Sequence, residues 1–118
     1  YCDPDELARV VDGRRFLIVS DCEGYEKTLF SESNISSLRQ SDILIEVHDF
    51  MDISILPYLR TLFASSHAIH ETESIDDLRK LDRYDYPEIS KLGLEERYNV
   101  TAEWRQRIMI WMYLTPLK

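Results

Sequence analysis

Short apolar runs alternate with segments of helical character along this chain. The apolar runs predict four β-strands, at residues 16–20, 42–47, 68–72 and 107–114. Helix-start chemistry or apolar residues at helical spacing predict helices near residues 4–12, 25–30, 35–39 and 52–63. Residues 74–104 are charged and rich in tyrosine, so we expect a long excursion that contains short helices. Strands that alternate with helices indicate an α/β fold.

The predicted strands differ in how they should pair. The first two are apolar without alternation, which is typical of strands covered on both faces of a parallel sheet. Helices between the first three strands imply right-handed crossovers and therefore parallel neighbours. No crossover helix is evident between residues 68–72 and 107–114. We therefore expect a mostly parallel sheet with an antiparallel last strand.

Acidic and imidazole groups follow the first two predicted strands. The first strand leads into the segment Asp21-Cys22-Glu23-Gly24-Tyr25-Glu26, and the second ends in Glu46-Val47-His48. If these strands are parallel, both segments lie at the same edge of the sheet. Ligands of open α/β sheets bind outside the carboxyl ends of the strands. The pattern therefore predicts a site as well as a fold.

Length and composition narrow the class of protein. The 118 residues suit one domain, and 44% hydrophobic residues favour a folded chain. A net charge of −8 argues against a general nucleic-acid-binding protein, which needs a basic face. No apolar run reaches the roughly 18 residues of a membrane span, and no signal peptide is visible. Two cysteines are too few for a disulfide scaffold. Together with the absence of a membrane span and of a visible signal peptide, this cysteine count leads us to expect a cytoplasmic protein without a membrane partner.

The two strand-end segments resemble the signatures of FkbM-type methyltransferases, and the spacing between them fits that family. The resemblance covers roughly residues 5 to 66. It implies an S-adenosylmethionine-dependent enzyme with a Rossmann-like class I methyltransferase sheet of seven strands, the last antiparallel. Residues 16–20, 43–47, 68–72 and 107–114 would then be strands four to seven.

The chain departs from that family in its glycines. The family's Gly-rich loop after the first strand is absent, because the three glycines are Gly13, Gly24 and Gly93. The resemblance therefore implies that residues 1–118 form the C-terminal, acceptor-side half of a methyltransferase domain, inactive alone, with the N-terminal cofactor-binding half missing. The first residue, Tyr1, fits this interpretation. Residues 16–19 would be an uncovered apolar edge, which predicts a homo-oligomer.

The resemblance also implies roles for the strand-end residues. We expect methyl transfer from S-adenosylmethionine to the oxygen of a small-molecule or glycan acceptor. Asp21 is expected near the cofactor's amino end or the acceptor, with Cys22 beside it at the cofactor. Glu23 or His48 would accept the proton of the attacking hydroxyl. Glu26 is expected to orient a neighbour or to cap a helix start.

Other interpretations remain open for the same residues. Cys22 can also be a small apolar filler, and we favour that interpretation. A metal-dependent hydrolase would use the oxygen-rich set of strand-end ligands, which suits Mg²⁺, Ca²⁺ or Mn²⁺ and comprises Asp21, Glu23, Glu46, His48 and Asp49. We favour acid–base chemistry without a metal over this alternative. A non-catalytic interaction module with the same half-fold is the third interpretation.

Overall fold

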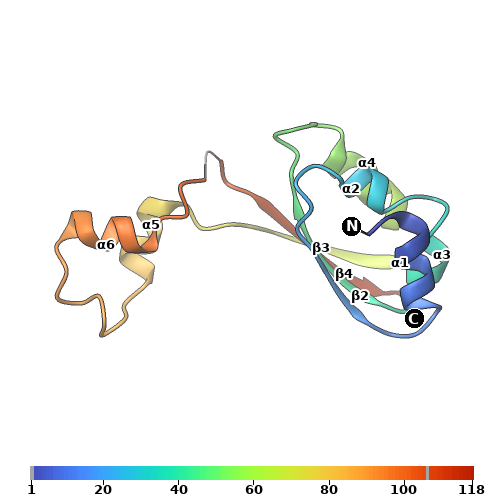
Figure 1. Cartoon of the computed structure of the whole chain (residues 1–118), viewed down its shortest axis with the longest axis horizontal. Helices are drawn as coiled ribbons and strands as arrows, with labels where there is room; N and C mark the ends of the chain where they lie inside the picture. The colour runs from blue at the N-terminus through green and yellow to red at the C-terminus, as the bar shows by residue number, and fades with distance from the viewer. Residues whose placement is uncertain (1, 106) are drawn as a thin grey trace. The chain divides into compact units, whose positions relative to one another are not determined.

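The computed structural model describes residues 2–105 and 107–118, which form an α/β fold. The elements follow in the order α1 (Pro4–Val11), β1 (Leu17–Ser20), α2 (Glu26–Leu29), α3 (Ile35–Leu38), β2 (Asp42–Val47), α4 (Ile55–Phe63), β3 (His67–Glu73), α5 (Asp77–Arg83), α6 (Leu94–Thr101) and β4 (Ile110–Pro116) (Figure 1). The chain divides into two compact units. Residues up to 72 together with 109–118 are the sheet unit, and residues 73–108 are the α5–α6 unit.

Local chemistry sets the first helix as predicted. The side chain of Asp3 accepts a hydrogen bond from the backbone N–H of Glu6 at 2.8 Å and so caps α1, with Pro4 in the first turn. The helix ends where Asp12 and Gly13 take left-handed conformations, with φ of 44° and 66°. The predicted helix start and stop are confirmed.

The sheet has the order β1-β2-β4-β3. β1 and β2 are parallel, with Leu17 opposite Asp42, whereas β2 and β4 are antiparallel, with Ile45 opposite Met112. The antiparallel last strand is therefore confirmed. The prediction of a mostly parallel sheet is wrong: the sheet is mixed and mostly antiparallel in its pairing, because β4 lies between β2 and β3 and separates them.

One face of the sheet is covered by helices α1 to α4. The shared core contains side chains from all four helices and from alternating strand positions: Leu7, Val11, Leu29, Phe30, Leu38, Ile43, Ile45, Val47, Ile55, Leu56, Leu59, Phe63, Met112 and Leu114. On the opposite face, Leu17 and Val19 of β1 are 65% and 62% exposed. The prediction that this strand is covered on both faces is therefore wrong, because β1 lies at the sheet edge and only its inner face meets the helical core.

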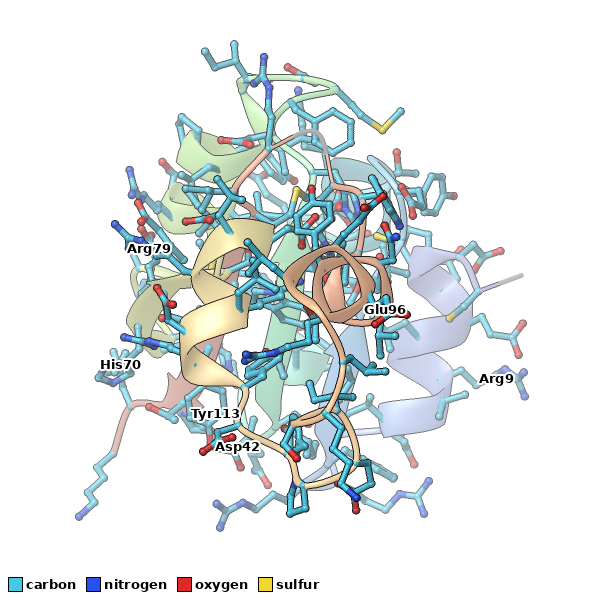
Figure 2. All side chains as sticks on the ribbon, turned by 90° about the vertical axis from the view of Figure 1, so that its left-hand side faces the viewer. Arg9, Asp42, His70, Arg79, Glu96 and Tyr113 are labelled. Atoms are coloured by element: carbon cyan, nitrogen blue, oxygen red, sulfur yellow. The ribbon has the colours of Figure 1, made fainter. Side chains whose placement is uncertain are left out.

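The open face of the sheet carries polar contacts as well. The hydroxyl of Tyr113 on β4 lies 3.5 Å from Oδ1 of Asp42 on β2, and both residues are labelled in Figure 2. Arg15 donates to Oδ2 of the same carboxylate at 3.1 Å. These contacts lie on the same side of the sheet as Leu17, which is paired with Asp42.

A buried histidine, His67, packs against the core at the start of β3. His67 donates from Nε2 to the carbonyl oxygen of Ser41 at 3.1 Å, and its Nδ1 lies 2.8 Å from Oγ of Ser66. Its ring packs edge-on against Phe63. Burial lowers the pKa of His67, so its neutral form is favoured. His67 is therefore a structural residue, with a hydrogen-bond partner at each ring nitrogen.

The α5–α6 unit coincides with the predicted excursion, and its short helices are confirmed. The Asp76 side chain caps α5 by accepting from two backbone N–H groups, and Gly93 N–H donates to the Glu96 carboxylate at the start of α6. Glu96 is labelled in Figure 2. Lys80 is buried, with Nζ at 2.9 Å from Asp77 and 3.0 Å from Glu103. A charged cluster therefore lies at the centre of this unit.

Candidate functional site

The candidate site lies where β1 and β2 end. Because these strands are parallel, the residues after Ser20 and Val47 reach the same edge of the sheet. A tight turn follows β1, in which Glu23 and Gly24 have left-handed φ values of 51° and 91°. A side chain at Gly24 would meet Sδ of Met51 at 3.0 Å, so glycine satisfies both the backbone and the space. The turn brings Glu26 back toward β2.

The centre of the site is a buried histidine–carboxylate pair. Nδ1 of His48 lies 2.6 Å from Oε1 of Glu26, and the two side chains are 4% and 0% exposed. An ionised carboxylate can only accept, so Nδ1 carries the proton and donates it. In the neutral form of the ring, Nε2 then has a free lone pair. The neighbour that Glu26 is predicted to orient is thus His48.

Two exposed carboxylates lie on the Nε2 side of His48. Asp21 Oδ1 is 3.5 Å from Nε2 and Glu23 Oε2 is 3.4 Å from it, and their side chains are 54% and 77% exposed. The structure thus brings together the three residues that the sequence predicts as catalytic. Such an arrangement can accept a proton at Nε2 and stabilise the imidazolium that results.

Cys22 lies beside this cluster with a different character. Its thiol is partly buried, lies 3.5 Å from Oγ of Ser20 and packs against the core. Burial is the main cause that raises the pKa of the Cys22 thiol. A raised pKa keeps the sulfur protonated and unreactive at neutral pH. These contacts agree with a small apolar filler.

The same edge contains the atoms that could hold a cation. One ligand atom each from Asp21, Glu23 and His48 lies within 4.8 Å of the others. Glu46 and Asp49, which the sequence adds to this set, are not in the group. Glu46 is instead a buried residue of β2, paired in register with Trp111 of β4.

Apolar side chains next to the site are a feature that the sequence reasoning missed. Phe50 follows His48 closely, and its ring centroid lies 5.8 Å from that of the imidazole. Phe50, Met51 and Ile53 are all exposed. The sequence signal was the apolar pair Phe50-Met51, which follows the strand end that carries His48.

The tyrosines of the predicted excursion make their contacts inside the α5–α6 unit. In the α5–α6 unit, Tyr98 lines a cavity of about 420 Å³ together with groups of both charges, including Asp76 and Arg107. Tyr84 and Tyr86 pack against each other with ring centroids 5.9 Å apart. Their contacts thus lie within the α5–α6 unit.

No family model, no curated protein and no solved structure matches the chain. Among the described residues, no helix combines the length and apolar character needed to cross a membrane.

Proposed function

We propose that this chain is the C-terminal, acceptor-side part of an S-adenosylmethionine-dependent methyltransferase that acts on a hydroxyl group. One observation carries the proposal: the two segments that resemble methyltransferase signatures meet in the buried pair of Glu26 and His48, joined by a 2.6 Å hydrogen bond. The antiparallel strand β4 beside β2 also supports it, since the family's last strand is antiparallel.

His48 is the proton acceptor in this proposal. Glu26 holds the proton on Nδ1, so Nε2 is free to take the hydroxyl proton of the acceptor as the oxygen becomes a nucleophile. The carboxylates of Asp21 and Glu23, 3.5 and 3.4 Å from Nε2, stabilise the positive charge that the ring then carries. S-adenosylmethionine would supply a methyl group on a sulfonium sulfur, which moves to the acceptor oxygen and leaves a neutral thioether.

The cofactor fits the acidic character of this edge. A half-exposed carboxylate such as Asp21 is a suitable partner for the cofactor's ammonium group, and Cys22 offers an apolar contact beside it. The Gly-rich loop expected for the rest of the cofactor is not in these 118 residues. The proposal therefore assigns cofactor binding largely to residues encoded upstream, and the chain alone is expected to be inactive.

The acceptor is a small molecule or glycan with a hydroxyl group beside an apolar surface. Phe50, Met51 and Ile53 expose apolar side chains in the loop that follows His48. The Phe50 ring lies 5.8 Å from the imidazole, close enough to pack on the carbon skeleton of an acceptor whose oxygen reaches Nε2.

The test is calorimetric titration of S-adenosylmethionine into this chain and into a form that carries the upstream residues, followed by a labelled-methyl transfer assay. We expect binding by the longer form alone. In that form, His48→Gln should lower the transfer rate by about 10²–10⁴-fold with cofactor affinity unchanged. His70→Gln, at an exposed position of β3, is the matched control. Absence of binding by both forms would contradict the proposal.

Glu26 is a positioning residue, and a graded pair of variants tests that role. Glu26→Gln keeps an oxygen that can accept from Nδ1, whereas Glu26→Ala removes it. We expect kcat to fall in both variants and to fall further in Glu26→Ala, with KM for the acceptor changed little. Equal losses in the two variants, or a loss confined to KM, would contradict a role in orienting His48.

A metal-dependent hydrolase is the second candidate function, because one atom each of Asp21, Glu23 and His48 lies within 4.8 Å of the others. Titration of the chain with Mn²⁺, followed by electron paramagnetic resonance, separates the two proposals. Tight binding that Asp21→Asn abolishes would favour the hydrolase. Binding that is weak and insensitive to Asp21→Asn favours acid–base chemistry.

A further inference from the structure

The α5–α6 unit contains two neighbouring cavities of different chemical character. The first, of about 380 Å³, is lined by Leu81, Leu94 and Glu95 together with Leu78 and Tyr98. The second is the cavity of about 420 Å³ described above, and Leu78 and Tyr98 line it as well. The two cavities therefore adjoin at this leucine–tyrosine pair. Each has the volume of a small-molecule site.

The first cavity is mainly apolar, and the leucines at its mouth do not stabilise the unit. Leu78 of α5 and Leu94 of α6 are each 70% exposed. The buried residue of α5 is Lys80, and no residue of α6, which the structure describes throughout, is buried. Exposed leucines that line one cavity from two neighbouring helices form an apolar surface that a ligand can cover.

The second cavity has acidic groups on its wall, but these are already paired. Oδ1 of Asp77 accepts from Nζ of Lys80 at 2.9 Å, and Oδ2 accepts from the backbone N–H of Trp104 at 3.1 Å. Asp76 caps α5 and pairs with Arg79, whose Nε lies 3.3 Å from Oδ2. Both carboxylates therefore serve the structure of the unit and are poorly placed to bind a cationic ligand.

Two arginines on the same wall, Arg105 and Arg107, supply positive charge. Arg105 pairs with Glu103. In the described part of the chain, no carboxylate pairs with Arg107. The basic side chains of this cluster exceed the acidic ones by one, since Arg79, Lys80, Arg105 and Arg107 stand against Asp76, Asp77 and Glu103. A guanidinium group binds a carboxylate or phosphate through two parallel hydrogen bonds, so this cavity suits an anion.

We propose that the α5–α6 unit binds an amphipathic anion, in which an aliphatic chain ends in a carboxylate or phosphate group. The chain covers Leu78, Leu81 and Leu94 in the first cavity, and the anionic head binds Arg107 in the second. Glu95 favours this orientation, because its carboxylate repels an anionic head from the apolar cavity. The site goes beyond the proposed methyl transfer and does not depend on it.

Calorimetric titration of the 118-residue chain with decanoate, decyl phosphate and decyltrimethylammonium, each below its micelle concentration, tests the proposal. We expect both anions to bind, and the cation, which has the same chain, to bind about tenfold more weakly. The tighter of the two anions assigns the head group as carboxylate or phosphate. Binding of neither anion, or equal binding of the cation, would overturn the proposal. Neither cofactor nor methyl transfer is measured, so this failure is distinct from failure of the proposed function.

Matched variants locate the site on the two cavities. Arg107→Gln removes the cation for the head, and Leu94→Asn removes apolar surface for the chain, so each should weaken decanoate binding about tenfold. Arg83→Gln and Val100→Asn make comparable changes at exposed positions outside both cavities and should leave the affinity unchanged. All four positions are exposed, so the circular dichroism spectrum should not change. Equal losses in the target and control variants would overturn the assignment.

Discussion

The sheet unit and the α5–α6 unit are stabilised by different kinds of interaction. In the described part of the chain, every buried apolar side chain belongs to the sheet unit, whereas Lys80 is the buried side chain of the α5–α6 unit. Leu78, Leu94 and Trp104 remain largely exposed in the α5–α6 unit. A segment of this size buries too little apolar surface to offset its chain entropy by that means. Its helices depend instead on caps and on the ion pairs of Lys80.

This difference predicts which substitutions matter in each unit. Truncation of an apolar side chain should lower the free energy of unfolding strongly in the sheet unit and hardly at all in the α5–α6 unit. Removal of a charged group should destabilise the α5–α6 unit more than the sheet unit. The chain offers a convenient probe, because Trp104 lies in one unit and Trp111 in the other. A Trp104→Phe background reports on the sheet unit, and Trp111→Phe reports on the α5–α6 unit.

The largest effect is expected for Leu59→Ala. Leu59 of α4 is fully buried in the core, so its truncation should lower the free energy of unfolding by about 2–5 kcal/mol. Leu94→Ala is the same change at an exposed position and should stay within about 0.5 kcal/mol. Urea unfolding followed by Trp111 fluorescence in the Trp104→Phe background measures the first, and Trp104 fluorescence in the Trp111→Phe background measures the second. Similar losses in the two variants would remove the distinction between the units.

Lys80→Met should act locally and more weakly. It removes the ammonium group from Asp77 and Glu103, and the local stability of α5 should fall by about 1–3 kcal/mol, the range for hydrogen bonds to charged groups. Hydrogen exchange followed by mass spectrometry should show faster exchange in α5 and unchanged exchange in β2. Lys91→Met, at an exposed lysine of the same unit, is the control. A uniform change across both units would contradict the prediction.

The sheet unit should lose stability in mildly acidic solution through His67. Burial holds the pKa of His67 below its ordinary value of 6.5, so the unfolded chain binds the proton more readily. Its contribution is fully present above pH 6.5 and is lost as the pH falls toward the lower, folded-state pKa. The urea midpoint should therefore drop in this window, and His67→Gln should reduce the drop. His70→Gln, at an exposed histidine, should leave it unchanged.

The smallest effect is expected for Asp77, and at lower pH. The hydrogen bond from Lys80 is the main cause that lowers the pKa of Asp77 below its ordinary value of 3.8. The ion pair therefore stabilises the unit above pH 3.8, and this contribution is lost as the pH falls through the folded-state pKa. The Trp104 backbone N–H donates to Asp77, so Trp104 fluorescence should report the transition. Asp77→Asn should remove it, and Asp82→Asn should not.

The local elements could be predicted from the sequence, because their signals are local. The apolar run at residues 42–47 is β2 to the residue, and the Asp3 cap with Pro4 marks the start of α1. The pairing of β4 with β2 could not be predicted in this way. Ile45 and Met112 are far apart in the chain, and their apolar character is the same for a parallel or an antiparallel neighbour.

The residues of the candidate site could be predicted from the sequence, but the directions of their side chains could not. Parallel strand ends meet at one edge, so Asp21, Glu23 and His48 could be grouped from the sequence. The direction of the imidazole depends on the left-handed turn at Gly24, which brings Glu26 under His48. The burial of Lys80 could not be predicted from the sequence. Hydrophobic periodicity assigns the apolar residues of a helix to the core and a lysine between them to the surface.

The position of β4 has a consequence for synthesis of the protein on the ribosome. β4 is the last element of the described chain, yet it lies inside the sheet between β2 and β3. Until residues 110–116 have emerged, the inner edge of β2 has no neighbour and β3 has no place in the sheet. The sheet unit therefore completes its fold late, and the nascent chain exposes a second apolar edge that chaperones can bind or other chains can capture.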